Sequence, residues 1–424
     1  MNCELKKGVY TVKVLVIGSG GREHAICWKI AQNPKVDKIF CASGNGGIQA
    51  ESKCTNIDIT DIDELVNFVL ESKIDLTVVG PENPLIEGIV DKFRSRGLNI
   101  FGPTSKAAML EGSKIYSKDF MKKYGIKTAK YGVFNDKDEA LKYIRECEYP
   151  VVIKADGLAA GKGVSICKNY KEAQFTIEDF MVKDIFKGAG KNIVIEEFLE
   201  GVEASILTIT DGKSIIPFMS AKDHKQIYDG GKGPNTGGMG AISPNPYCSK
   251  KVLKDFKESI MNPTLKGIQQ ENLDYIGIIF FGIMITKKGI YLLEYNVRMG
   301  DPETQAVLPL MKSDLVELIQ ASLEGKLDKF DLQWKKGACC SVVAASKGYP
   351  GKYNTGFSIE GMEKSNNIFA AGVKMKNGEF ITSGGRVLSA YGLGNDLNEA
   401  IESAYNSLKG INFEGMYFRT DIGR

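Results

Sequence analysis

Residues 12–24 read VKVLVIGSGGREH, and this stretch decides the class of fold. The run VKVLVI is rich in β-branched residues and ends at a glycine turn, which is typical of a buried parallel strand that turns into a helix. We expect that helix over 23–31, further strands over 38–42, 75–79 and 98–102, and another helix over 63–72. Strands that alternate with helices predict a doubly wound parallel sheet from residue 12 to residue 103.

The pattern of predicted helices and strands changes after residue 103. A helical stretch over 106–125 is followed by short strands at 149–154 and 163–167 and a helix at 170–182, which predict a small α+β unit inserted into a larger one. Longer strands and turn-rich loops fill 193–285, a helix is expected at 314–324, and the last segment, 334–424, combines strands with two glycine turns. The class is therefore α/β, with further domains behind the first sheet.

Size and charge limit the functions open to this chain. Its 424 residues suggest about three domains. With 55 basic and 52 acidic residues the net charge is +3, which argues against a nucleic-acid or membrane partner. Residues 1–11 lack the apolar core of a secretory signal, and the nine cysteines show no metal-binding spacing, so we expect a cytoplasmic protein with reduced thiols.

The glycine turn at 18–21 suits a phosphate, because a turn between strand and helix leaves backbone N–H groups free. A dinucleotide fingerprint would need glycine where Glu23 stands and an acid about 20 residues later, which residues 40–45 do not supply. A monophosphate held beside Arg22 fits better, and a purely structural turn is the alternative.

Residues 151–164 read VVIKADGLAAGKGV and place Lys154 at the end of a strand before a glycine-rich loop. The spacing is not that of a Walker A loop, since Gly163 follows Lys162 where Ser or Thr is required. The pattern predicts a lysine that reaches a nucleotide phosphate under a flexible loop, and a mobile surface hairpin is the alternative.

Two further segments carry polar groups suited to ligands. The strand 193–199 (IVIEEFL) ends in acids, with Glu203 just beyond, and these fit a ribose, although solvated acids at a strand end are the alternative. Residues 222–240 combine Asp223 and His224 with many glycines, which indicates close backbone approach to a ligand. We expect a binding role for His224, and disorder is the alternative for the loop.

The most informative segment is 291–305, YLLEYNVRMGDPETQ. Alternation along a strand puts Glu294 and Asn296 on one face, where their oxygens suit Mg²⁺ with ATP phosphates and water as the other ligands. Arg298 has the same parity and fits a bidentate clamp on a carboxylate, while the turn that follows presents Asp301 and Glu303. The sequence has no G-x-S-x-G, H-E-x-x-H or Cys–His pattern, which favours catalysis by positioning and electrostatics.

Together these motifs resemble the glycinamide ribonucleotide synthetase family of ATP-grasp enzymes. The resemblance rests on VLVIGSGGREH (14–24), VVGP (78–81), EGSK (111–114), residues 152–164, NTGGMGA (235–241) and RMGDPETQ (298–305), in this order. It covers 12–424 and implies ligation of glycine to 5-phosphoribosylamine, through glycyl phosphate, with ATP as co-substrate and Mg²⁺ or Mn²⁺. It also implies a phosphoribosylamine-binding domain at 12–103 after an extension (1–11), a catalytic domain at 104–127 and 193–328, a small α+β lid at 128–192 and a C-terminal α+β domain at 329–424.

The resemblance also implies roles for individual residues. Nucleotide contacts would come from Lys114, Lys154, Gly157, Gly161, Lys162, Gly163, Glu196, Phe198 and Glu203, and the metal would be held by Glu294 and Asn296. Substrate contacts would come from Gly20, Gly21, Arg22, His24, Asp223, His224, Asn235, Thr236, Gly237, Gly238, Met239, Arg298, Asp301, Pro302 and Glu303. Of these, Asp223, Arg298 and Asp301 would act directly at the reacting groups, with Arg298 on the carboxylate of glycine.

Several alternatives stay open from the sequence. Another ATP-grasp carboxylate–amine ligase shares most of these motifs, and a nucleotide-binding module without turnover is a third possibility. The strand 275–285 lacks the acid that many ATP-grasp enzymes place there, so the number of metals is open, and the expected oligomeric state is a monomer, with a dimer as alternative.

Overall fold

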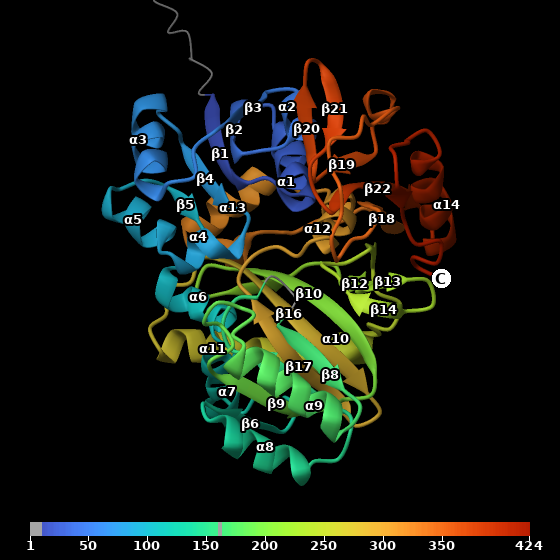
Figure 1. Cartoon of the computed structure of the whole chain (residues 1–424). Helices are drawn as coiled ribbons and strands as arrows, with labels where there is room; N and C mark the ends of the chain where they lie inside the picture. The colour runs from blue at the N-terminus through green and yellow to red at the C-terminus, as the bar shows by residue number, and fades with distance from the viewer. Residues whose placement is uncertain (1–10, 160–162) are drawn as a thin grey trace, which may run out of the picture.

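The computed structural model describes residues 11–159 and 163–424. Figure 1 shows the N-terminal domain in blue and the C-terminal domain in orange and red, side by side above a green and yellow central sheet, with the lid below. No helix within the described ranges has the length and apolar character needed to cross a membrane.

The N-terminal domain is built on a parallel sheet with strand order β3-β2-β1-β4-β5. Leu15 and Ile17 pack with the apolar faces of α3 and α5, whereas Val14 and Val16 lie on the α1 side, so the predicted doubly wound arrangement is confirmed. The strand order reverses between β1 and β4, and ligands of such sheets bind beyond the strand ends at that point. Its elements are β1 (Val12–Gly18), α1 (Gly21–Ala31), β2 (Val36–Ser43), α2 (Gly46–Ala50), β3 (Cys54–Ile57), α3 (Ile62–Ser72), β4 (Leu76–Val79), α4 (Glu82–Ile86), α5 (Ile89–Ser95) and β5 (Ile100–Phe101).

The central part of the chain forms an antiparallel sheet with strand order β11-β10-β16-β17. The helix predicted over 106–125 is two helices, because Ser113 leaves helical geometry and its Oγ accepts a hydrogen bond from the Tyr116 N–H at 3.1 Å. The same hydroxyl donates to Asp156 Oδ1 at 2.8 Å, which ties the break to the lid. The elements are α6 (Ser105–Gly112), α7 (Lys114–Lys123), β10 (Val202–Thr210), β11 (Ile215–Pro217), α10 (Lys250–Phe256), α11 (Asn262–Gln270), β16 (Gly277–Thr286), β17 (Gly289–Asn296), α12 (Glu303–Val307) and α13 (Leu315–Leu323).

The lid is a four-stranded antiparallel sheet with strand order β6-β9-β7-β8. Val151 and Ile153 point into the core under α8 and α9, so the alternate residues, Val152 and Lys154, lie on the opposite face, as the sequence predicted. Its elements are β6 (Tyr131–Phe134), α8 (Lys137–Arg145), β7 (Val151–Ala155), β8 (Val164–Cys167), α9 (Tyr170–Ile177), continued by one π-helical turn, and β9 (Ile193–Glu197).

The C-terminal domain shares its sheet with the central chain. The strand order is β12-β15-β18-β22-β19, with β23 beside β18, and β12 and β15 come from residues 222–243. The glycine-rich loop is therefore attached to the C-terminal sheet. The elements are β12 (Lys222–Asp223), β13 (Gln226–Tyr228), β14 (Lys232–Asn235), β15 (Gly240–Ser243), β18 (Ala338–Ser346), β19 (Ile368–Ala370), β20 (Val373–Lys376), β21 (Glu379–Thr382), β22 (Arg386–Gly394), α14 (Leu397–Leu408) and β23 (Met416–Tyr417).

Candidate active site

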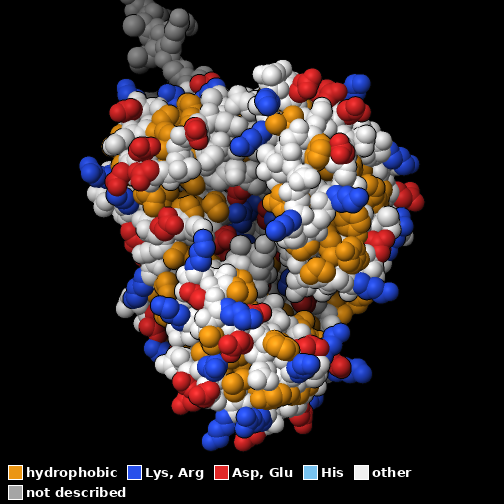
Figure 2. Space-filling view, viewed as in Figure 1, with side chains coloured by type: hydrophobic (Ala, Val, Ile, Leu, Met, Phe, Trp, Pro, Cys, Tyr) orange, Lys and Arg blue, Asp and Glu red, His pale blue; other side chains and the backbone are white. Residues whose placement is uncertain are grey.

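The candidate site lies where the N-terminal domain, the C-terminal domain and the central sheet with its lid meet. Figure 2 shows the molecule hollowed there, with basic and acidic side chains at the base of the hollow. Four loops reach this region: the turn after β1, the turn after β4, the loop before β15 and the segment after β17, which carries Arg298 and Asp301.

The turn after β1 is shaped by Glu23. Glu23 Oε2 accepts from the Gly20 N–H at 2.6 Å, and Oε1 pairs with Arg22 Nε at 2.5 Å. A Cβ on Gly18 or Gly80 would overlap the Glu23 side chain, so part of this glycine pattern serves the cap of α1. The Gly20 N–H and the Arg22 Nε are thus used internally, and the phosphate contact expected at this turn stays a prediction.

Arg22 also joins this turn to the segment after β17. Its Nη1 donates to Met299 O at 3.1 Å. Gly21 lies so close to Gln305 that an added Cβ would come within 2.6 Å of Nε2, and a Cβ on Gly20 would come within 3.3 Å of Asp301 Oδ2. The two motifs that the sequence separates by about 280 positions therefore form one wall of the site.

His24 is buried between domains. Its Nδ1 accepts from the Ala370 N–H at 2.8 Å, and its Nε2 lies 3.2 Å from Glu51 Oε1. The ring also packs edge-on against Phe369. Both ring nitrogens have protein partners, so His24 joins the N-terminal and C-terminal domains, and the substrate contact expected of it stays a prediction.

A buried carboxylate holds two lysines beside the lid sheet. Glu196 Oε1 lies 3.0 Å from both Lys118 Nζ and Lys154 Nζ, and all three side chains are buried. Burial lowers the pKa of Lys118 to about 8, against the opposing effect of Glu196. Glu196, predicted near adenine and ribose, is thus the counter-ion that holds Lys154 in place, and Lys118 is a residue that sequence reasoning missed.

The lid contributes the glycine loop beside these lysines. Lys114 Nζ lies 3.4 Å from Gly157 O, and burial lowers the pKa of Lys114 although Glu294 opposes the shift. Gly163 directly precedes β8, while the predicted contacts Gly161 and Lys162 lie outside the described residues. Phe198, just after β9, is half-buried.

An acidic cluster with one lysine lies between β10 of the central sheet and β12 of the C-terminal sheet. Lys225 Nζ pairs with Glu203 Oε2 at 2.5 Å. Burial raises the pKa of Asp223 to about 7, with Glu303 and Glu203 adding to the effect of burial and Lys225 opposing it. Glu303 is buried and accepts from Ser205 Oγ at 3.0 Å, so it braces β10 against α12. Sequence reasoning missed Lys225, although it lies in the same motif as Asp223.

The loop before β15 is shaped by internal hydrogen bonds. Thr236 Oγ1 donates to Lys225 O at 2.7 Å and accepts from the Gly238 N–H at 2.9 Å. A Cβ on Gly238, whose φ is +110°, would overlap Pro302, so two predicted motifs pack together there. Asn235 is exposed and accepts from Gln226.

Two predicted substrate contacts in this loop are structural. His224 is buried, its Nδ1 lies 3.4 Å from Gly240 O, and its Nε2 accepts from the Gly423 N–H at 3.2 Å. Burial lowers the pKa of His224 to about 4, so the ring is neutral. Met239 is fully buried in the C-terminal core. The side chains of His224 and Met239 are therefore part of the core, and the substrate contacts expected of them stay predictions.

The segment after β23 clamps the hairpin of β13 and β14. The Thr420 N–H donates to Asp229 Oδ1 at 2.9 Å, and the Gly230 N–H donates to Asp421 Oδ2 at 2.7 Å. Arg419 is buried and donates from Nε to Asp421 Oδ1 at 2.7 Å, which lowers the pKa of Asp421. This C-terminal clamp, residues 419–421, fixes the loop that leads to Asn235.

The predicted metal ligands lie together at the end of β17. Burial would raise the pKa of Glu294, but Lys225, Lys154 and Lys114 lower it below its usual value, so the carboxylate is ionised. Within 11–159 and 163–424, no group of three His, Cys, Asp or Glu side chains could hold a metal ion. One carboxylate with the amide oxygen of Asn296 fits Mg²⁺, which commonly takes few protein ligands together with phosphates and water.

Arg298 is held by two acids that sequence reasoning did not assign. Its Nε donates to Glu82 Oε2 at 3.0 Å, and its Nη2 lies 2.9 Å from Glu111 Oε1 and 3.1 Å from Asn296 Oδ1. Nη1 donates to Met299 O at 3.2 Å. Of the five N–H donors of a guanidinium, these four contacts leave one, so the predicted bidentate clamp would require Arg298 to exchange partners.

Signals for these acids were present in the sequence. Glu111 opens the EGSK motif, and its Oε2 accepts from the Val297 N–H at 2.7 Å. Glu82 follows β4 at the point where the strand order reverses, and ligand-binding loops gather there.

Asp301 pairs with a residue from the C-terminal domain. Arg386 Nη2 lies 3.1 Å from Asp301 Oδ2, and Gln305 Nε2 donates to Asp301 Oδ1 at 2.8 Å. Burial would raise the pKa of Asp301, but Arg386 and Arg22 hold it below its usual value. The sequence carried no signal for Arg386, which lies 85 positions away.

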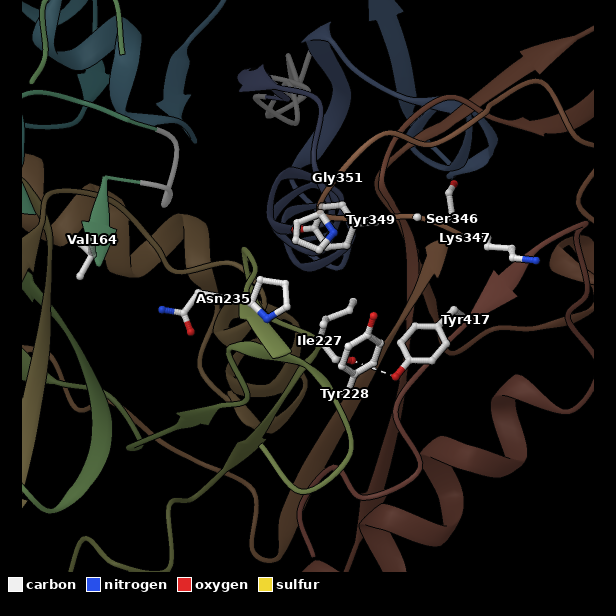
Figure 3. A pocket seen from close by; sticks show the side chains of 12 residues that line it. Val164, Ile227, Tyr228, Asn235, Ser346, Lys347, Tyr349, Gly351 and Tyr417 are labelled. Atoms are coloured by element: carbon white, nitrogen blue, oxygen red, sulfur yellow. Dashed lines mark hydrogen bonds between the residues drawn. The ribbon is translucent and has the colours of Figure 1, made fainter. Parts of the chain in front are cut away.

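A cavity of about 650 Å³ opens beside the glycine-rich loop (Figure 3). Val164 of the lid, Tyr228 and Asn235 of the hairpin, and Tyr349 and Lys347 of the C-terminal domain line it. The Tyr349 hydroxyl accepts from the Gly237 N–H at 2.9 Å, so one lining residue of the cavity is bonded to the loop before β15.

Comparisons with known proteins agree with this geometry. The chain matches the sequence profiles of the phosphoribosylglycinamide synthetase N domain (12–111), ATP-grasp (A) domain (112–304) and C domain (339–424). It is 62% identical to the phosphoribosylamine–glycine ligase of Clostridium acetobutylicum, over 97% of this chain and 100% of that protein. It is 55% identical to the ligase of that name from Fusobacterium nucleatum, over 97% of this chain and 98% of that protein.

A solved structure is also similar. The crystal structure of the phosphoribosylamine–glycine ligase of Thermotoga maritima matches with a TM-score of 0.86 and 35% identity, over 97% of this chain and 100% of that one.

Proposed function

The chain belongs to the phosphoribosylglycinamide synthetase family, and on that premise we propose how its residues divide the work of joining glycine to 5-phosphoribosylamine. The reaction consumes ATP and gives glycinamide ribonucleotide, ADP and phosphate through glycyl phosphate, as a step of purine biosynthesis. We assign the residues from the position of segment 298–301. This segment lies between the lysines around Glu294, which we call the nucleotide end, and the turn after β1.

At the nucleotide end, Lys114 and Lys154 contact the phosphates of ATP. Glu196 fixes Lys154 from beneath, and Lys118 shares that carboxylate. Because these side chains are buried, their charges act in a medium of low effective dielectric constant, where they stabilise a transferring phosphoryl group strongly. Gly157 and Gly163, on either side of residues that lie outside the described ranges, border the phosphates, while Phe198 and Glu203 border adenine and ribose.

Family membership implies ATP and a divalent metal, and we propose Mg²⁺, with Mn²⁺ as a substitute. Glu294 and Asn296 would hold it, with ATP oxygens as further ligands. Bound metal neutralises charge on the transferred phosphoryl group. Asn296 also accepts from Arg298 at 3.1 Å, which links the metal end to the carboxylate end of the site.

Glycine and phosphoribosylamine occupy the other side of Arg298. Its remaining N–H binds the carboxylate of glycine while Glu82 and Glu111 hold the guanidinium in place. The N-terminus of α1 and Arg22 bind the phosphate of phosphoribosylamine, because a helix N-terminus and an arginine both favour a dianion. Asp301 lies next to that turn and is suited to orient the amine.

The partners we propose are these small molecules alone. With 55 basic and 52 acidic residues the net charge is only +3, so the protein has no large excess of positive charge to attract the phosphates of nucleic acid. We propose a cytoplasmic monomer, with a dimer as the alternative for sedimentation analysis to distinguish.

ADP release tests this proposal. The assay contains Mg·ATP, glycine, and phosphoribosylamine formed in situ from ribose 5-phosphate and ammonia, and each component is omitted in turn. Release that requires all three supports the ligase. Release without glycine or without the sugar phosphate would mean a different ATP-grasp reaction, and ATP binding without release would favour a nucleotide-binding module.

A further inference from the structure

Charged side chains at the site fall into two groups. The nucleotide group contains Lys154 and Glu196, with Lys118 beside them. The amine group contains Asp301 and Arg386, beside the turn at Gly20. Lysines 114, 154 and 225 lower the pKa of Glu294, and arginines 22 and 386 lower the pKa of Asp301, while Arg298 acts on both carboxylates and so lies between the two groups.

Arg386 makes more contacts than a simple ion pair. Nη2 lies 3.1 Å from Asp301 Oδ2, and Nη1 donates to Asp301 O at 2.9 Å, so one guanidinium holds both the side chain and the backbone of this residue. Nη1 also donates to Gly237 O at 2.5 Å. A Cβ on Gly237 would lie 2.9 Å from Arg386 Cζ, so the loop approaches the guanidinium as closely as only glycine permits.

The position of Arg386 in the fold makes these contacts rigid. Arg386 is the first residue of β22, a central strand of the C-terminal sheet, and its side chain is only 21% exposed. Asp301 precedes α12, and Gly237 precedes β15, so the guanidinium joins three elements that are far apart in the sequence. Tyr349 adds a second C-terminal contact by accepting from the Gly237 N–H.

We propose that Arg386 is a positioning residue for the amine-dependent half of the reaction, supplied to the site by the C-terminal domain. The inference rests on the proposed ligase function. In that half-reaction the amine nitrogen attacks the carbonyl carbon of glycyl phosphate, the C–N bond forms, the C–O bond to phosphate breaks, and the departing phosphate takes the electron pair and the proton. Asp301 orients the amine by accepting a hydrogen bond from it, and Arg386 fixes the direction of that carboxylate.

A point charge cannot replace this guanidinium fully. Lysine presents one ammonium, whereas Arg386 contacts Asp301 and Gly237 through two nitrogens in a fixed plane. The conservative variant should therefore restore the charge beside Asp301 but only part of the geometry.

Steady-state kinetics of Arg386→Gln and Arg386→Lys test the inference, with the KM of each substrate measured separately. We expect Arg386→Gln to lower kcat/KM for phosphoribosylamine about 10- to 100-fold and to change the KM for ATP less than about threefold. Arg386→Lys should recover part of the loss. Arg424→Gln is the control, because Arg424 is an exposed arginine that lies over the ring of Tyr405 and has no part in the proposed chemistry.

The possible outcomes distinguish failure of the positioning role of Arg386 from failure of the proposed ligase function. Equal losses for ATP and phosphoribosylamine, or no loss for either, would overturn the positioning role. Lysine restoring no more activity than glutamine would overturn the requirement for a cation beside Asp301. A wild-type enzyme that shows no ligation would overturn the proposed function itself, whatever the variants do. If Arg386→Gln does not fold, the KM for ATP and the KM for phosphoribosylamine are compared in Arg386→Lys instead.

Discussion

Acidification should destabilise this protein through His224, and the size of the effect follows from its burial. Burial lowers the pKa of His224 from an ordinary 6.5 to about 4. The unfolded chain therefore takes up a proton near pH 6.5 while the folded ring stays neutral until about pH 4, so stability is lost as the pH falls through that window. One pKa unit corresponds to about 1.4 kcal/mol, which gives a loss of about 2 kcal/mol at pH 5 and about 3 kcal/mol at pH 4.

Urea denaturation at pH 7.5 and pH 5.0, followed by the fluorescence of Trp28 and Trp334, measures this loss. The informative quantity is the difference in pH dependence between the wild type and His224→Gln, because other groups that titrate contribute equally to both proteins. We expect the variant to be less stable at pH 7.5, since it loses ring contacts to Gly240 and Gly423, but to lose about 2 kcal/mol less on acidification. An identical pH dependence in both proteins would refute the assignment of a buried neutral ring.

Three further perturbations address the site. Gly238→Ala should lower ligase activity at least about 10-fold and destabilise the fold by about 1–3 kcal/mol, because φ is +110° and the new Cβ overlaps Pro302. Gly410→Ala is the control in the activity and the unfolding measurements, because Gly410 has open space around it. Lys154→Gln should raise the KM for ATP and lower kcat about 100-fold, since a buried donor to the phosphates is lost, and an unchanged KM for ATP in initial-rate measurements would contradict the assignment. Glu294→Gln should lower kcat at least about 100-fold while ATP still binds, and half-maximal activity should require a higher Mg²⁺ concentration because one metal ligand is lost; full activity would remove Glu294 from the metal site.

The fold was predictable where one local pattern determines it. The apolar run of β1, its glycine turn and the helix after it specified the parallel sheet, because a strand buried on both faces needs a continuous apolar sequence. The break between α6 and α7 was not predictable, because Ser113 leaves helical geometry to bond Asp156, a partner 43 positions away. The sharing of a sheet between β15 and β18 is likewise a long-range pairing that local periodicity does not encode.

The same distinction holds for the site. Glu294 and Asn296 were placed by strand parity, and Lys154 by its position at the end of a strand. The partners of Arg298 were harder to predict. Its position on the strand suggested a clamp on a substrate carboxylate, but only the structure reveals that Arg298 already pairs with Glu82 and Glu111. His24 and His224 looked like ligand contacts as rare polar residues in motifs, whereas their ring nitrogens serve contacts with segments that the sequence places far away.

The C-terminal clamp implies an order of assembly during synthesis. Thr420 follows its partner Asp229 by 191 positions, so at roughly 5–20 residues per second the ribosome needs about 10–40 s to reach it. By then the N-terminal sheet, the lid and the lysines of the nucleotide end have all emerged, and each can fold on contacts already made. The hairpin that leads to Asn235 is held by the clamp only when residues 419–421 arrive, so a nascent chain can complete the cluster of Lys118, Lys154 and Glu196 before this hairpin is fixed.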